Sequence, residues 1–456
     1  MTEMPYMLKA LSASFWWAPV LSIFILYGAH LSLGANTNAL AMILVIASYG
    51  LCLTVLLFTP QVKTAFGHPA LVITALFFAL TLLMLALQLG PHLPGGAHPF
   101  WAWLTEKGGI TLDRDATIRE LLKLTALGAI FITGIAIGIR RQQASVFFRL
   151  FMVAGLAYAI WTFITHFIAL GATENDNLRQ SFRLTAGFGS ANSAATVFGS
   201  LSVLSLAAII RSAKKSASRH VNKAIFLERL LRYSSLPLVA LLLCMTVLLL
   251  TASRGGILAS LFALLVFGLW ESLNTTPKDK SAGRPFSMIM LSLLAISFVF
   301  LISSDLFINR LETDVLATDV RLETFAPHWQ AFLASPLSGY GLGSFYTVNG
   351  LLMNVQNLRV LHDIGALHNV YLQWLEEGGA LASALMFGTL VLINWQILQG
   401  VRARMRMRTW LRAVLCISLL IVLHGTVDYG LQVPSIATMW ALLLGVGFGI
   451  SVAKGR

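Results

Sequence analysis

The stretch Pro69–Gly90, PALVITALFFALTLLMLALQLG, contains no charged side chain over 22 residues. An α-helix needs about 20 apolar residues to cross the hydrocarbon core of a bilayer. The whole chain of 456 residues is 57% hydrophobic and 11% charged, whereas roughly 25% of the residues in soluble domains are charged. The sequence therefore predicts an all-α, polytopic integral membrane protein.

Similar apolar blocks recur along the chain, and Gly and Pro inside them are common in membrane spans. We expect a single transmembrane domain over residues 1–456, in which the run from Ser14 is the first span because no small-residue cleavage site follows it. About twelve spans are predicted, at 14–33, 39–59, 69–90, 121–139, 146–170, 191–210, 234–252, 255–271, 286–304, 378–398, 411–430 and 434–453.

The chain carries 32 Lys and Arg against 19 Asp and Glu, a net charge of +13. The basic residues gather in alternate connections, notably 211–232 and 402–412. The positive-inside rule assigns these connections and both termini to the cytoplasm. Basic residues between spans indicate contact with anionic lipid headgroups rather than nucleic acid. Three cysteines, Cys52, Cys244 and Cys416, lie inside apolar blocks without metal-ligand or redox spacing.

The connections on the other side are long, over 90–120, 171–190 and 304–367. Loops longer than about 15 residues usually have a function or are disordered. The third, taken as 305–367 between the ninth and tenth spans, includes the apolar-periodic piece RLETFAPHWQAFLAS. We predict a partly helical periplasmic loop.

The segment Arg183–Thr196, RLTAGFGSANSAAT, is the first of three polar patches on this side. Arg183 precedes a Gly- and Ser-rich turn, and Asn192 stands where an N-cap is expected ahead of the sixth span. Exposed N–H groups at a helix start, together with an arginine, favour an anion. The alternative is an interfacial arginine whose side chain reaches the headgroups.

The second patch is Thr251–Gly256, TASRGG, in which Arg254 lies between two apolar runs. A charge near the membrane interior is costly and normally lines a cavity or has a partner. Simple turn chemistry is the alternative.

The third patch is His368–Gly379, HNVYLQWLEEGG, directly before an apolar run. A helix that began near His368 would place His368 and Tyr371 on one face. Histidine is the commonest general base, and the alternative is a structural histidine at a helix start.

Two arginines and a histidine at one membrane face suit transfer of a group from a diphosphate. Arginine binds phosphate groups bidentately and stabilises the leaving charge, while a neutral imidazole can accept a proton from an attacking hydroxyl. No acidic cluster in the sequence suggests a metal, and no Walker loop or nucleophile elbow occurs in suitable context. The simplest hypothesis is a metal-free transfer without a cofactor.

These patches, in this order, resemble the O-antigen ligase/polymerase superfamily of bacterial envelope glycosyltransferases. Arg183, Phe188 and Asn192 are similar to its R-x-x-G-x-F-x-N-P-N segment, although Ala186 replaces the usual glycine and the proline is absent. The other matching segments are SRGG at 253–256, SPLSGYGLGSF at 335–345 with Arg321 upstream, and HNVYLQWLEEGG at 368–379. The resemblance covers about residue 121 to the C-terminus.

The resemblance implies a GT-C-like glycosyltransferase of the bacterial inner membrane, with its active site at the periplasmic face. The donor would be a glycan on undecaprenyl diphosphate, and the acceptor a hydroxyl of lipid A–core or of a growing glycan. His368 would be the catalytic base or orient the hydroxyl, and Arg183, Arg254 and Arg321 would bind the diphosphate. Asn192, Asn369 and Tyr371 would support them, and His424 and Asp428 would either border the cavity or pack at a helix end.

A ligase that acts on lipid A–core is the leading hypothesis, and a polymerase of the same superfamily is the main alternative. Protein O-glycosylation is a third activity of this class. A secondary transporter would place ionisable residues at the bilayer midplane and show two similar halves. Here the charges gather at the predicted outer boundary and the two halves differ. A flippase or assembly partner without catalytic activity is a further alternative.

Overall fold

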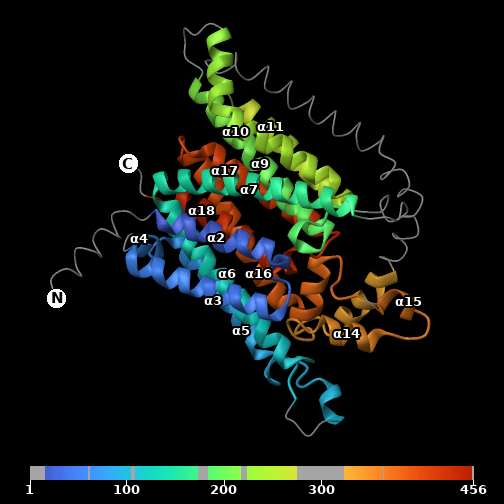
Figure 1. Ribbon diagram of the computed structural model, residues 1–456. Coiled ribbons are helices and arrows are strands. Elements are labelled where there is room, and N and C mark those ends of the chain that lie inside the picture. Colours follow the sequence, from blue (N-terminus) through green and yellow to red (C-terminus); the bar gives the residue numbers. More distant parts are fainter. Residues whose placement is uncertain are drawn as a thin grey trace, which may run out of the picture.

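The computed structural model describes residues 16–59, 62–103, 108–172, 183–216, 223–274, 323–362 and 364–453 (Figure 1). Every regular element in these ranges is a helix. The long helices are α2 (Trp17–Leu31), α3 (Asn38–Phe58), α5 (Pro69–Leu87), α6 (Arg114–Ile139), α7 (Arg141–Gly171), α9 (Ala191–Ser216), α10 (Lys223–Leu250), α11 (Arg254–Leu273), α16 (Val370–Ala403), α17 (Arg408–His424) and α18 (Pro434–Val452). The short ones are α4 (Val62–Phe66), α14 (Phe345–Leu352), α15 (Leu358–Leu361) and the 3₁₀ turns η1 (Leu33–Ala35), η2 (Pro99–Trp103), η3 (Ala186–Phe188) and η4 (Gly430–Gln432).

The predicted all-α polytopic class is confirmed. Among the described residues, eight helices are long and apolar enough to cross a membrane, and α2 and the 234–250 part of α10 are shorter apolar helices. Eleven predicted spans coincide with a helix. The twelfth, at 286–304, lies outside the described residues.

The helices form a bundle in which α9 packs against α10, α11 and α17, while α16 packs against α5, α17 and α18. Among the described helices, α6 and α18 make the most extensive contact. Gly134 and Gly138 of α6 face Gly445 and Gly449 of α18, where any added Cβ would lie less than 3 Å from the backbone of the other helix. Small residues four apart let two membrane helices approach this closely.

Several helix boundaries differ from the prediction. The largest difference is at α10, which begins at Lys223 instead of 234, and three others lie at caps or kinks, which hydropathy does not detect. Helix α6 begins at Arg114, because the Asp113 carboxylate accepts a hydrogen bond from the Ala116 amide at 2.8 Å. Helix α17 ends at His424 instead of 430. Helix α16 begins at Val370 and is interrupted at Gly379, whose φ of 69° suits glycine; the predicted span began at 378.

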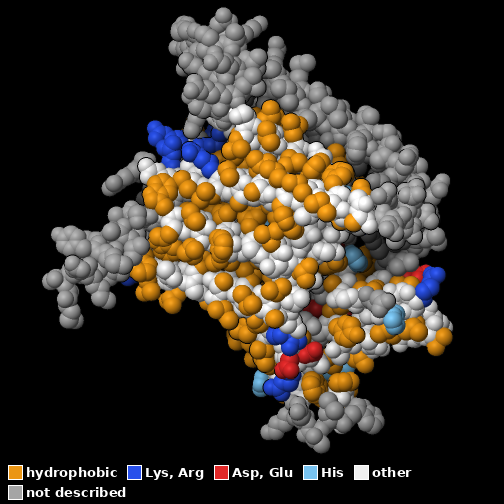
Figure 2. Space-filling view, in the orientation of Figure 1, with side chains coloured by type: hydrophobic (Ala, Val, Ile, Leu, Met, Phe, Trp, Pro, Cys, Tyr) orange, Lys and Arg blue, Asp and Glu red, His pale blue; other side chains and the backbone are white. Residues whose placement is uncertain are grey.

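Connections that were predicted to share a side do meet at one end of the bundle. Arg211 at the end of α9 donates to the Arg406 carbonyl (2.8 Å), and Arg404 donates to the Ser451 carbonyl near the end of α18. We call this the basic end. Figure 2 shows Lys and Arg side chains gathered at one end of the helices, mixed charges and histidines at the opposite end, and apolar side chains between them. This is the surface of a protein embedded in a bilayer.

The opposite end, here called the site end, collects the loops that were predicted to lie outside. The imidazole Nδ1 of His30 lies 3.0 Å from the Ser435 hydroxyl, and the Val370 amide donates to the Gly425 carbonyl at 3.0 Å. The described part of the long loop contains a helix over 323–334, α14 and α15. The prediction of a partly helical loop is therefore confirmed for those residues.

A buried carboxylate joins three helices at the basic end. Glu271 of α11 pairs with Lys214 of α9 and, at 3.1 Å, with Arg412 of α17. Glu271 and Arg412 are each about 3% exposed. Removing one partner of a buried pair leaves an uncompensated charge, so this cluster fixes how α9, α11 and α17 pack.

We expect Glu271→Gln to lower the free energy of unfolding by about 3 kcal/mol, because Arg412 would stay buried without a carboxylate. The thermal midpoint of the protein purified in detergent measures the effect. Glu323→Gln, at an exposed glutamate, is the matched control. Equal midpoints for the two variants would contradict the prediction.

Candidate active site

His368 lies at the site end, between the long loop and α16. The Asn369 side chain caps α16 by accepting hydrogen bonds from the Tyr371 and Leu372 amides, so His368 precedes the helix. For this reason His368 and Tyr371 do not share a helical face, and the Tyr371 hydroxyl donates instead to the Val422 carbonyl (2.7 Å). Asn369 and Tyr371 thus position α16 against the end of α17.

The His368 ring lies between an aromatic residue and a carboxylate. Its edge packs against Tyr429 with ring centroids 5.0 Å apart. Its Nδ1 lies 3.6 Å from Oδ1 of Asp428 and is shielded from solvent. That separation is just beyond a hydrogen bond, and a small shift of the ring would complete it.

Arg183 holds the turn between α10 and α11. Its Nε donates to the Thr251 carbonyl (3.0 Å), and its Nη2 lies 3.3 Å from the Ala252 carbonyl and 3.4 Å from Asn192 Oδ1. Arg254 begins α11 two residues after Ala252 and three after Thr251. The first two predicted patches are therefore in direct contact.

Asn192 connects all three patches, although it is not the N-cap. The Ser190 hydroxyl accepts a hydrogen bond from the Ser193 amide (3.4 Å) in the capping position instead. This leaves the Asn192 side chain to donate to Asp428 Oδ1 (2.9 Å) and to accept from the Ser253 hydroxyl (2.7 Å). A chain of side chains thus runs from Arg183 through Asn192 and Asp428 to His368.

Asp428 is the buried centre of this network, with 1% of its surface exposed. Burial acts to raise the pKa of its carboxyl, but His368, the charge of His424 and the Asn192 amide outweigh burial, and the net pKa is lower than the usual 3.8. Asp428 is therefore ionised at neutral pH. His424 closes the network from α17 through Thr196, with Nδ1 and Oγ1 2.8 Å apart.

Four described residues other than glycine have a positive φ, namely Leu33, Ala35, Ala186 and Ala252, and the last two lie in the arginine patches. Ala186 has φ 52° at the position where the resemblance expects glycine, and Ala252 has φ 47° beside Arg254. Non-glycine residues in this region cost of order 1 kcal/mol or more and concentrate at functional sites. Ala186 and Ala252 therefore place strained backbone inside the two arginine patches. Arg321 lies outside the described residues.

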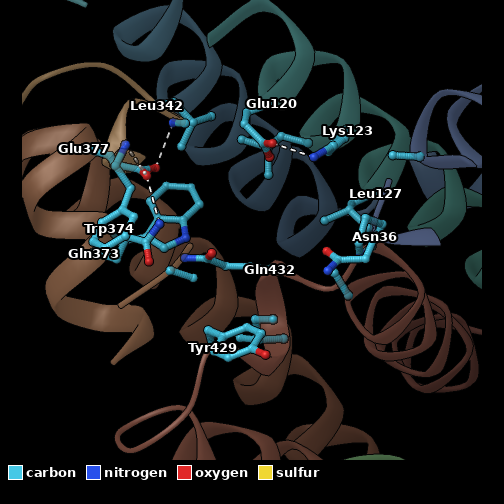
Figure 3. Close-up of a pocket in the computed structure, with 18 of the residues that line it drawn as sticks. Asn36, Glu120, Lys123, Leu127, Leu342, Gln373, Trp374, Glu377, Tyr429 and Gln432 are labelled. Carbon is cyan, nitrogen blue, oxygen red and sulfur yellow. Dashed lines mark hydrogen bonds and ion pairs between the residues drawn. The ribbon is translucent and has the colours of Figure 1, made fainter. Parts of the chain in front are cut away.

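A cavity of about 530 Å³ adjoins His368. Figure 3 shows Glu120 and Lys123 of α6 along one wall and Trp374 and Glu377 of α16 along another, with Tyr429 across from α6. A volume between about 300 and 1,000 Å³ is typical of ligand sites. His368 lines this cavity, whereas Arg183 and Arg254 do not.

The two glutamates of the third patch hold the long loop in place. Glu377 is buried and accepts hydrogen bonds from the Gly343 amide (2.8 Å) and the Phe345 amide (3.3 Å). Glu376 is buried against His328, whose Nδ1 lies 2.9 Å from both carboxylate oxygens. The segment 335–345 is thereby fixed to α16, which carries His368 at its start.

Part of the chain that carries this site matches a known protein family. Residues 239–387 match the O-antigen ligase family. This stretch includes Arg254, the long loop and His368, and it confirms the resemblance seen in the motifs. No curated protein matches the chain. The O-antigen ligase segment supplies the catalytic candidate His368, whereas Arg183, Asn192 and Asp428 come from outside it.

Several site residues were missed or only suggested by the sequence. Asp428 was expected to border the cavity or pack at a helix end, and it proves to be the centre of the network. His328 and Gln88 belong to none of the motifs. The Gln88 amide donates to the Ser338 and Glu377 carbonyls at 2.6 and 2.8 Å. In the sequence, these residues could be noticed only as polar side chains beside apolar runs.

Among the described residues, no group of three or more His, Cys, Asp or Glu side chains is arranged to hold a metal ion. The metal-free reaction stays a prediction.

Proposed function

We propose that this protein is a ligase-type glycosyltransferase that moves a polysaccharide from undecaprenyl diphosphate to a hydroxyl of lipid A–core at the periplasmic face of the inner membrane. The observation that carries the proposal is that His368 lies against a buried carboxylate which is connected, through Asn192, to Arg183 and the turn bearing Arg254. The family match over 239–387 supports the reaction class.

In the proposed reaction the acceptor hydroxyl oxygen attacks the anomeric carbon of the donor sugar. The bond from that carbon to the diphosphate oxygen breaks, and undecaprenyl diphosphate leaves with the electron pair. The hydroxyl proton passes to Nε2 of His368, while Nδ1 faces Asp428. The carboxylate stabilises the imidazolium that forms, as in catalytic His–Asp pairs generally.

The arginines would bind the leaving diphosphate. Guanidinium groups suit this task because they remain charged and form two parallel hydrogen bonds to phosphate. Two nitrogens of Arg183 already donate to carbonyls of the α10–α11 turn. We therefore propose that Arg183 also positions Arg254, in addition to binding the diphosphate. Arg254 then carries most of the contact with the diphosphate.

A polymerase that uses a growing lipid-linked glycan as acceptor would need the same groups. Reconstitution of purified protein with undecaprenyl-diphosphate glycan tests both activities, with lipid A–core in one tube and only further donor molecules in the other. Glycan attached to lipid A–core supports the ligase, and lengthened lipid-linked glycan supports the polymerase. A chelator should not reduce transfer; activity lost with chelator and restored by divalent cation would overturn the metal-free reaction.

We expect Arg254→Lys to reduce transfer about a hundredfold, because a point charge cannot replace bidentate binding of the leaving diphosphate. Initial rates in the reconstituted assay measure the effect. Arg359→Lys, at an exposed arginine of α15, should retain the wild-type rate. A fully active Arg254→Lys protein would contradict the proposed role.

A further inference from the structure

Four polar side chains face the cavity beside His368 without a hydrogen-bond partner among the described residues. They are the indole N–H of Trp374, the amides of Asn36 and Gln432, and the hydroxyl of Tyr429. Figure 3 shows them on different walls of the same space. Uncharged donors and acceptors that converge on a cavity suit a ligand rich in hydroxyl groups.

The Trp374 ring is held in a fixed position on one wall. It packs against a cluster of apolar side chains that includes Leu85, Leu124 and Ala382, and it lies 6.5 Å from the ring of Phe387. The side chain is only half-buried and lines the cavity. The electron-rich face of an immobile aromatic ring attracts polarised C–H groups, which cover one face of a pyranose ring.

The opposite wall is apolar where it enters the bundle. Leu44 and Val45 of α3 and Leu127 of α6 line it, and the Glu120–Lys123 ion pair lies nearer the site end. A cavity with these walls accommodates an uncharged sugar better than a diphosphate, which would have to desolvate without a guanidinium partner. The arginines lie outside the lining.

From these observations we infer that the cavity is the acceptor-glycan subsite. Trp374 stacks on the acceptor sugar, and Gln432, Asn36 and Tyr429 bind its hydroxyl groups beside His368. The inference rests on the proposed function, because His368 must receive its proton from the acceptor. It assigns the donor diphosphate and the acceptor sugar to opposite sides of that imidazole.

The test measures binding separately from turnover. The protein is purified in detergent with the His368→Ala substitution, and saturation-transfer NMR follows two lipid-free probes, core oligosaccharide and repeat-unit oligosaccharide. We expect at least one probe to bind. Adding Trp374→Ala should weaken that binding about tenfold, Gln432→Ala should weaken it several-fold, and Trp374→Phe should retain most of it. Undecaprenyl diphosphate should not displace the sugar.

The matched controls are Trp395→Ala, at a tryptophan of α16 that is 57% exposed and does not line the cavity, and Gln356→Ala, at an exposed loop glutamine. Thermal midpoints identify variants that are simply unfolded, and Trp374→Phe keeps the test valid if the alanine variant unfolds. Binding of neither probe to the folded His368→Ala protein, equal binding by the Trp374 and Trp395 variants, or displacement by undecaprenyl diphosphate would overturn the subsite.

In the transfer assay, the cavity variants should raise the KM for the acceptor and leave the KM for the donor unchanged. A rise confined to the donor KM would also overturn the assignment. Transfer by the His368→Ala protein would instead remove the proposed base while the binding results still decide the subsite. The two failures are therefore distinguishable.

Discussion

His368→Ala is expected to lower the rate of glycan transfer by about a thousandfold while the protein remains folded. Proton transfer by a positioned general base contributes roughly 10²–10⁴ in rate. The side chain is partly exposed, and it lies against Asp428 and Tyr429. Its loss should therefore remove chemistry without opening the core.

The comparison needs a histidine substitution that touches nothing in the network. His92→Ala, at an exposed position in the α5–α6 loop, meets this condition. Both variants should share the wild-type thermal midpoint, and only His368→Ala should lose transfer. Product formation within tenfold of wild type in the His368→Ala protein would remove the imidazole from the mechanism.

Hydropathy located the helices because the requirement it detects is local. A helix that crosses a bilayer must be apolar over its own length, whatever it packs against. Its ends depend on other physics. The cap at Asp113 and the positive φ at Gly379 decide where α6 begins and where α16 bends, and neither changes the hydropathy of its neighbourhood.

The candidate site was predictable as separate patches and not as a network. Arg183, Arg254 and His368 each stand out as charged or titratable residues beside apolar runs. Their connection depends on Asn192 and Asp428, which are 236 positions apart in the chain. No local pattern specifies such a pairing, because it arises from the packing of α9 against the turn after α17.

The sequence also could not show which polar residues near His368 have a structural role and which have a catalytic one. Asn369 caps α16, and Glu377 accepts backbone amides of the long loop. Both roles depend on where the helix starts, which is Val370 and not His368 as the helical-face argument assumed. A shift of two residues in a boundary is therefore enough to exchange structural and catalytic roles among neighbouring side chains.

Asp428 is the residue whose importance the structure raises most. It is the one acidic side chain within 4 Å of the His368 ring among the described residues. Its Oδ1 receives the Asn192 amide, and its Oδ2 is buried without a hydrogen bond to a described residue. A buried carboxylate of this kind is costly and is retained where its charge stabilises a neighbouring cation.

Asp428→Asn is expected to lower transfer at least about a hundredfold, because the amide keeps the shape of the carboxylate but cannot stabilise an imidazolium at His368. The matched control is Asp113→Asn, which should be nearly silent because asparagine caps a helix as well as aspartate does.

The wild-type pKa of Asp428 lies below 3.8, so the charge of its carboxylate is present above that value and is lost only as the pH falls through the lowered pKa. The carboxylate is therefore ionised at about pH 8, where imidazoles are neutral, and the rates are compared there. A ratio of wild-type to variant rates near one would mean that the carboxylate charge does not act on His368.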